Sequence, residues 1–194
     1  MFVNRVKELQ LLNDEYKEEG FRFSVLYGRR RVGKTTLLKE YIQNKESIYF
    51  LVTLESENIV LKRFQDIIAN YLNDDFLKEL KIDSFEQIFK YISQKTFEKK
   101  LIIIIDEFQY LTKINSSIPS IFQYIIDELL KQKNIHLILC GSIISMMYEQ
   151  TLSYNSPLYG RRTSAIKLEA IKFEYIKEFF SKKSEIELIE LYSI

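Results

Sequence analysis

The chain has 194 residues, of which 46% are hydrophobic and 28% are charged, and this composition excludes a largely disordered protein. Its formal net charge of +1 gives no overall attraction to nucleic acid, so DNA binding would need a local basic patch. The longest strictly aliphatic run, LIIII, is too short to span a bilayer, and the N-terminal segment lacks the apolar core of a signal peptide. Cys140 is the only cysteine, so no internal disulfide can form. We therefore expect a cytoplasmic protein without a membrane partner.

Hydrophobic periodicity predicts alternating helices and strands along the chain. In the first half these are a helix near 5–18, a strand near 22–27, a helix at 34–44, a strand at 47–52, and helices near 56–72 and 84–97. In the second half they are a strand at 101–106, a helix near 117–132, a strand at 135–140, a short helix near 143–150, a loop over 153–162, a strand within 165–170 and a helix near 172–181. This alternation predicts an α/β fold with a parallel sheet covered on both faces.

The segment YGRRRVGKTT at 27–36 matches the G-x-x-x-x-G-K-[ST] pattern between a strand and a helix. Its glycines permit backbone angles that let N–H groups surround phosphate, and the following helix adds its positive dipole end. Lys34 would reach the β- and γ-phosphates and Thr35 would bind Mg²⁺. The candidate phosphate loop comprises Gly28, Arg29, Arg30, Arg31, Val32, Gly33, Lys34, Thr35 and Thr36.

Arg29, Arg30 and Arg31 place three long, positively charged side chains in the middle of this loop. Because the backbone grips phosphate in such a loop, their side chains should mostly point away. We expect a positive rim that raises the local nucleotide concentration and pairs with acids on neighbouring segments.

The segment LIIIIDE at 101–107 has the Walker B pattern, an aliphatic strand that ends in two acids. Asp106 would hold Mg²⁺ through a water, and Glu107 would orient and deprotonate the attacking water. A carboxylate poised to activate water favours a hydrolase over a kinase. NKES at 44–47 and DEFQ at 106–109 do not supply guanine-reading or switch motifs, which favours ATP over GTP.

Two further segments carry candidate catalytic residues. Ser142 follows a strand and could contact the γ-phosphate or attacking water, or could cap the next helix. Arg161 and Arg162 lie in a predicted loop, where either could supply transition-state charge, from the same chain or from a neighbouring copy. A solvated basic loop is the alternative.

Five segments occur in one order: FVNRVKEL, YGRRRVGKTTLL, LIIIIDEFQYL, CGSIISMM and PLYGRRT. Together they resemble the archaeal-type ATPases, P-loop NTPases near the AAA+ and STAND groups. The resemblance implies an AAA+-like parallel five-stranded sheet of order 5-1-4-3-2 sandwiched by helices. It places Phe2, Val3 and Arg5 near the adenine and makes Ser142 the sensor-1 residue.

The chain also departs from that family. Ile143 stands where a second serine is frequent, and relatives usually continue into a winged-helix lid and often a nuclease-like domain. We therefore expect residues 1–194 to form a single nucleotide-binding domain whose lid and effector domains are missing.

The expected function is a Mg-dependent ATPase that couples ATP hydrolysis to an unidentified partner or DNA-related process. A nucleotide-gated STAND-like signalling module with little turnover is one alternative, and a P-loop small-molecule kinase with lid arginines is another. ATP and ADP are the expected ligands, self-association could supply an arginine in trans, and the net charge does not support a DNA partner.

Overall fold

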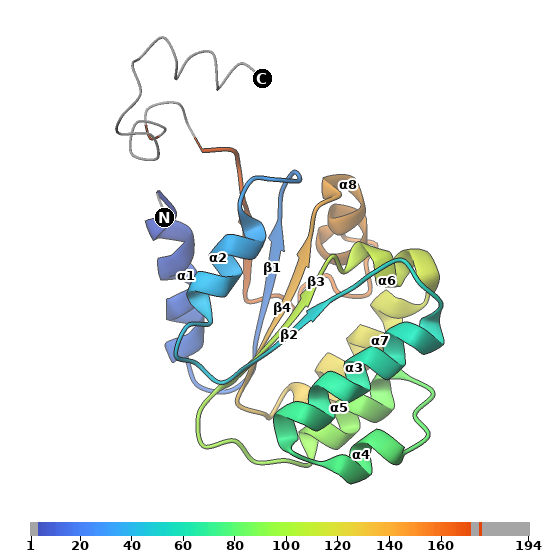
Figure 1. Cartoon of the computed structure of the whole chain (residues 1–194). Coiled ribbons are helices and arrows are strands. Elements are labelled where there is room, and N and C mark those ends of the chain that lie inside the picture. The colour runs from blue at the N-terminus through green and yellow to red at the C-terminus, as the bar shows by residue number, and fades with distance from the viewer. Residues whose placement is uncertain (1–3, 172–174, 176–194) are drawn as a thin grey trace, which may run out of the picture.

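The computed structural model describes residues 4–171 and residue 175. At its centre lies a five-stranded sheet in the order β2-β3-β4-β1-β5, and every neighbouring pair is parallel (Figure 1). The strands are β1 (Arg22–Tyr27), β2 (Ser47–Leu51), β3 (Leu101–Asp106), β4 (Ile135–Gly141) and β5 (Ser164–Lys167). Read from the other edge, this is the expected order 5-1-4-3-2, so the predicted α/β fold class is confirmed.

The neighbouring strands β3 and β4, both inside the sheet, are buried along their whole length. Their side chains alternate between the two faces of the sheet, as strand geometry requires. Ile102 and Ile104 belong to one hydrophobic cluster, whereas Ile103 and Ile105 belong to the other. A continuous aliphatic run is therefore needed, because both faces of these strands are covered by helices.

Helices cover the two faces unequally (Figure 1). On one face lie α1 (Val6–Lys17) and α2 (Lys34–Tyr41), whose leucines pack against the smaller cluster. On the other lie α3 (Glu57–Leu72), α5 (Phe85–Ser93) and α7 (Ile118–Tyr124), the last continued by the π-helical turn η1 (Ile125–Leu130). In the described part of the chain, no helix is both long and apolar enough to span a bilayer.

Four short elements refine the predicted pattern. Helices α4 (Asp75–Glu79) and α6 (Gln109–Ile114) were not predicted, because five or six residues hold too little periodicity. The predicted helix 143–150 is α8 (Ile144–Met147) followed by the π-helical turn η2 (Tyr148–Leu152). The predicted helix 172–181 lies outside the described residues, apart from residue 175.

A buried histidine joins the sheet to α2. His136 on β4 is fully buried, with its Nε2 atom 2.7 Å from Ser24 Oγ and its Nδ1 atom 2.8 Å from Tyr41 Oη. Burial, followed by the positive charges of Lys100, Arg22 and Lys45, lowers the pKa of His136 to about 3. The ring therefore stays neutral in the folded protein.

This lowered pKa predicts a loss of stability in acid. Between the unfolded pKa near 6.5 and the folded pKa near 3, the unfolded chain binds the extra proton, so stability falls as pH drops through that window. The expected loss from His136 alone is about 2 kcal/mol between pH 8 and pH 5. Urea unfolding of the wild type and of His136→Gln at both pH values checks this, and an identical pH dependence in the two proteins would refute it.

Candidate active site

The candidate phosphate loop connects β1 to α2 at the carboxyl end of the sheet. Its backbone turns through two left-handed positions, Arg31 with a φ of 66° and Gly33 with a φ of 95°. Gly33 is also the N-cap of α2, so the free N–H groups of that helix face the loop. Gly28 is required for a different reason: a Cβ there would lie 2.2 Å from the backbone oxygen of Leu168.

We expect Gly28→Ala to destabilise the fold, because the contacting atom is backbone just beyond β5 and cannot rotate away. Overpacking of this kind costs about 1–3 kcal/mol. Gly160→Ala is the matched control, since its Cβ would meet no atom within 4 Å and only its φ of 76° resists the change. Chemical denaturation should show the larger loss for Gly28→Ala. A smaller loss of stability in Gly28→Ala than in Gly160→Ala would mean that the backbone of Leu168 does not lie this close to the loop.

Lys34 points back into the loop that precedes it. Its Nζ atom donates hydrogen bonds to the backbone oxygens of Gly28 and Arg29, both at 2.9 Å, and the residue is only 6% exposed. The ammonium is thus held by neutral carbonyl groups at the centre of the loop. This position is suited to an anion that enters the loop.

Thr35 and Asp106 meet although they are 71 residues apart. Thr35 Oγ1 donates a hydrogen bond to Asp106 Oδ2 at 3.2 Å, and Asp106 is 2% exposed. The other carboxylate oxygen, Oδ1, accepts the backbone N–H of Glu107 at 2.9 Å. The loop and the tip of β3 therefore form one site, as expected when carboxyl ends of parallel strands share an edge.

Tyr49 on β2 is a third partner of Asp106 that the sequence analysis missed. Its hydroxyl also donates a hydrogen bond to Asp106 Oδ2. Burial, together with this bond to a carboxylate, raises the pKa of Tyr49, so the phenol stays protonated. Tyr49 lies opposite Ile104 in the register of β2 and β3, and only strand pairing could have placed it here.

Glu107 lies beside Asp106 in a left-handed conformation, with a φ of 58°. Its Oε2 atom accepts a hydrogen bond from Ser142 Oγ at 2.7 Å and a second one from Gln109 Nε2. Ser142 follows β4 and makes no capping bond to α8, whose N-cap is Ile143. The helix-cap alternative for Ser142 is therefore wrong, and its hydroxyl belongs to the Glu107 site.

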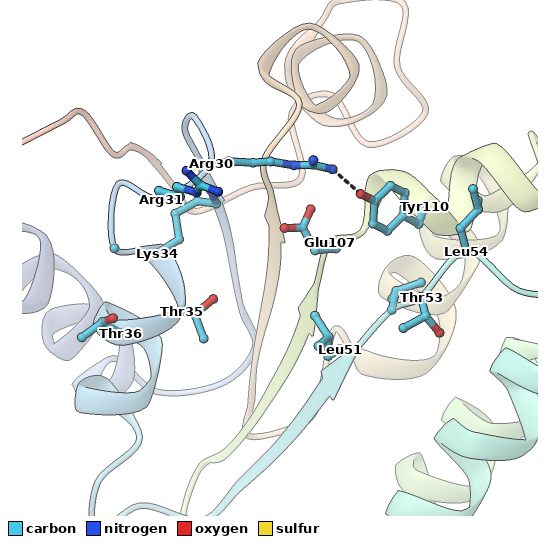
Figure 2. Close-up of a pocket in the computed structure, with 12 residues that line it drawn as sticks. Arg30, Arg31, Lys34, Thr35, Thr36, Leu51, Thr53, Leu54, Glu107 and Tyr110 are labelled. Carbon is cyan, nitrogen blue, oxygen red and sulfur yellow. Dashed lines mark hydrogen bonds between the residues drawn. The ribbon is translucent and has the colours of Figure 1, made fainter. Parts of the chain in front are cut away.

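A cavity of about 650 Å³ opens between the loop, the end of β2 and the start of α6 (Figure 2). Figure 2 shows the Glu107 side chain between Lys34 and Tyr110, beneath the hydrogen bond of 2.6 Å from Arg30 to the Tyr110 hydroxyl. The predicted site residues that line this cavity are Arg30, Arg31, Gly33, Lys34, Thr35, Thr36 and Glu107.

The arginine rim differs from the expectation in one respect. Among the described residues, no carboxylate lies within ion-pair distance of Arg29, Arg30 or Arg31. Arg30 instead donates a hydrogen bond to the hydroxyl of Tyr110. Arg29 and Val32 line a separate cavity of about 290 Å³ beside the end of β5.

Arg5 ties the N-terminal segment to the loop. Its guanidinium donates hydrogen bonds to the backbone oxygens of Val32 at 2.9 Å and Glu169 at 2.6 Å, and it pairs with Glu8 at 3.1 Å. A cavity of about 470 Å³ is lined by Arg5, Glu8, Glu169 and Tyr175, among others. Phe2 and Val3, expected near the adenine, lie outside the described residues.

The two candidate arginines after Gly160 do not line the 650 Å³ cavity. Arg161 forms a bidentate ion pair with Asp127 of η1, with a closest distance of 2.6 Å. Arg162 stacks over the ring of Tyr159, 5.7 Å from its centroid. In this structure Arg161 therefore joins the loop to η1, and a catalytic role for either arginine stays a prediction.

Residues 2–193 match a protein family described as an ATPase domain predominantly from Archaea. The chain belongs to this ATPase family. An uncharacterised protein of Methanocaldococcus jannaschii is 42% identical over 193 residues, which cover 99% of this chain and 41% of that protein. The archaeal ATPase resemblance drawn from the five segments is thereby confirmed.

Solved structures share the fold of this ATPase domain. A Walker-type ATPase of Pyrococcus abyssi superposes with a TM-score of 0.71 at 22% identity, covering 99% of this chain and 63% of that one. The ORC2 protein of Aeropyrum pernix, solved in ADPNP and ADP complexes, superposes with a TM-score of 0.67 at 16% identity, covering 93% and 52%. The chain thus spans less than two thirds of the length of each of these proteins.

Proposed function

We propose that residues 1–194 form a nucleotide-binding domain that hydrolyses ATP to ADP and phosphate with Mg²⁺. The observation that carries this proposal is the meeting of Thr35 Oγ1 and Asp106 Oδ2 at 3.2 Å, next to the cavity lined by Lys34 and Glu107. The phosphate loop, the oxygens of Thr35 and Asp106 that would bind the metal, and the candidate base Glu107 thus lie at one edge of the sheet. Membership of the ATPase family supports ATP as the nucleotide.

The residues present fit a magnesium ion. Thr35 and Asp106 offer one hydroxyl and one carboxylate oxygen, and Mg²⁺ prefers such hard oxygen ligands together with waters and phosphate oxygens. When bound, Mg²⁺ would neutralise charge on the β- and γ-phosphates. Asp106 is already oriented for this role, because its Oδ1 atom is fixed by the backbone N–H of Glu107.

Lys34 and the loop would bind the triphosphate. The ammonium would exchange the carbonyl oxygens of Gly28 and Arg29 for phosphate oxygens, which carry full charge and form stronger hydrogen bonds. The N–H groups at the start of α2 would face the same phosphates. The cavity beside Arg5 and Tyr175 is the proposed place for the adenine, as the family resemblance implies.

Glu107 would accept the proton of the attacking water. Its Oε2 atom is occupied by the hydroxyl of Ser142 and the amide of Gln109, whereas no described residue donates to Oε1. Because Glu107 lines the cavity beside Lys34, Oε1 would be the oxygen that takes the proton. Ser142 would keep the carboxylate in place from β4.

A product assay tests this proposal against the alternatives. The chain is incubated with Mg-ATP, and released phosphate, ADP and any phosphorylated acceptor are measured with and without excess EDTA. We expect phosphate and ADP in equal amounts, and only with the metal. Phosphate transferred to an added small molecule would support the kinase. Binding without turnover, together with a nucleotide-dependent change in oligomeric state, would support the STAND-like module. The proposal also includes coupling of hydrolysis to a partner or a DNA-related process, and an arginine supplied in trans by a second copy of the chain.

A further inference from the structure

Gln109 is a buried polar residue in contact with the proposed base. It is the first residue of α6 and is fully buried. Its Nε2 atom donates to Glu107 Oε2 and lies 3.3 Å from Ser142 Oγ. Its Oε1 atom is buried and, within the described part of the chain, has no hydrogen-bond partner.

The orientation of this amide follows from its neighbours. If the amide were turned over, its carbonyl oxygen would face the Glu107 carboxylate oxygen, and two acceptors cannot share a hydrogen bond. Nε2 must therefore face Glu107. The carbonyl oxygen then lies beside Gly141, where an added Cβ would be only 2.3 Å from it.

Packing alone does not explain a glutamine here. Burying a carbonyl oxygen without a partner lowers stability, and an apolar side chain of the same size would avoid that cost. What an apolar side chain could not provide is the hydrogen bond to Glu107. The amide is thus explained by its effect on the carboxylate.

We infer that Gln109 is a positioning residue for the hydrolysis of ATP, acting through Glu107. This inference rests on the proposed function. Gln109 and Ser142 donate to the same oxygen, Oε2, from two different elements, and together they fix the rotation of the carboxylate. Oε1 has no donor among the described residues, and the side chain that carries it lines the cavity. Proton transfer is sensitive to such placement, because a base must lie within hydrogen-bond reach of the water it activates.

The test compares Gln109→Met with Gln150→Met. Gln150 is a matched control, because its Oε1 is also buried without a described partner, while its Nε2 donates to Thr112, which contacts Gln109 only at the backbone oxygen. We expect Gln109→Met to lower kcat about 10-fold or more, with the Kd for Mg-ATP changed less than about twofold. Gln150→Met should leave kcat within about twofold of the wild type. Thermal melting of both variants checks that they fold.

Two further variants test whether the fall in kcat comes from the lost hydrogen bond to Glu107. Gln109→Leu also removes the donor without adding a charge, so it should lower kcat about as much as Gln109→Met, and it serves if the methionine variant does not fold. In a Glu107→Gln background, Gln109→Met should have no additional effect on turnover, because the group it positions is gone.

Three results would overturn the inference while the wild type hydrolyses ATP. These are an unchanged kcat in Gln109→Met, a rise in Kd as large as the fall in kcat, or the same loss in the Glu107→Gln background as in the wild type. Absence of hydrolysis by the wild type would instead reject the proposed function itself, and with it the reaction that Gln109 is inferred to assist.

Discussion

Replacement of Glu107 by glutamine is expected to slow ATP turnover strongly while leaving ATP bound. The amide has the size of the carboxylate and can still meet Ser142 and Gln109, but it cannot take a proton from water. General bases contribute about 10²- to 10⁴-fold to rate, so kcat should fall by about that factor. Phosphate release at saturating Mg-ATP measures kcat, and calorimetric titration measures the affinity.

The control for this variant is Glu149→Gln. Glu149 is exposed on η2 and does not line the cavity, so the same loss of charge there should leave turnover unchanged. If Glu107→Gln hydrolyses ATP as fast as the control, Glu107 is not the base, and the water must be activated by another group.

Replacement of Lys34 by alanine is expected to weaken ATP binding by about 10- to 100-fold. Hydrogen bonds to charged groups contribute about 1.5–3 kcal/mol, and the ammonium would face the most highly charged part of the nucleotide. Lys34 is also almost fully buried within the loop, where solvent does not weaken this interaction as it does at an exposed lysine. Titration of wild type and variant with Mg-ATP provides the measurement.

Lys39→Ala is the matched control for Lys34. Both lysines belong to α2, but Lys39 is exposed in the last turn of the helix and does not line the cavity. Its replacement removes the same charge from the protein and should change the Kd less than about twofold. Equal affinities of Lys34→Ala and the wild type would show that the loop does not hold the triphosphate.

The parts of the site that could be predicted follow from local pattern. The aliphatic run of β3 marks a strand buried on both faces, and the glycine spacing marks a tight loop before a helix. The strand before the loop and the strand that ends in Asp106 have their carboxyl ends at the same edge of a parallel sheet. The meeting of Thr35 and Asp106 could therefore be expected from the sequence. The strand order came from the family resemblance, because periodicity alone does not say which strands are neighbours.

The parts that escaped prediction depend on contacts between distant segments. Tyr49 reaches Asp106 only because β2 pairs with β3. Gln109 is close to Glu107 in sequence, but no spacing rule predicts that its amide turns back to this carboxylate and to Ser142, which follows β4. Arg161 was predicted from its loop, but its ion pair with Asp127 spans 34 residues and no spacing rule connects them. Polar residues of this kind acquire their roles from tertiary packing.

Whether this loop binds the triphosphate can be seen in a crystal structure of the chain with Mg²⁺ and a non-hydrolysable ATP analogue. We expect the triphosphate within the loop from Gly28 to Thr35, Lys34 Nζ moved from the backbone carbonyls to phosphate, and Thr35 Oγ1 about 2.1 Å from the metal. Asp106 should lie in the same metal site, directly or through one water. A nucleotide bound elsewhere, with the contacts of Lys34 and Thr35 unchanged, would show that this loop is not the nucleotide site.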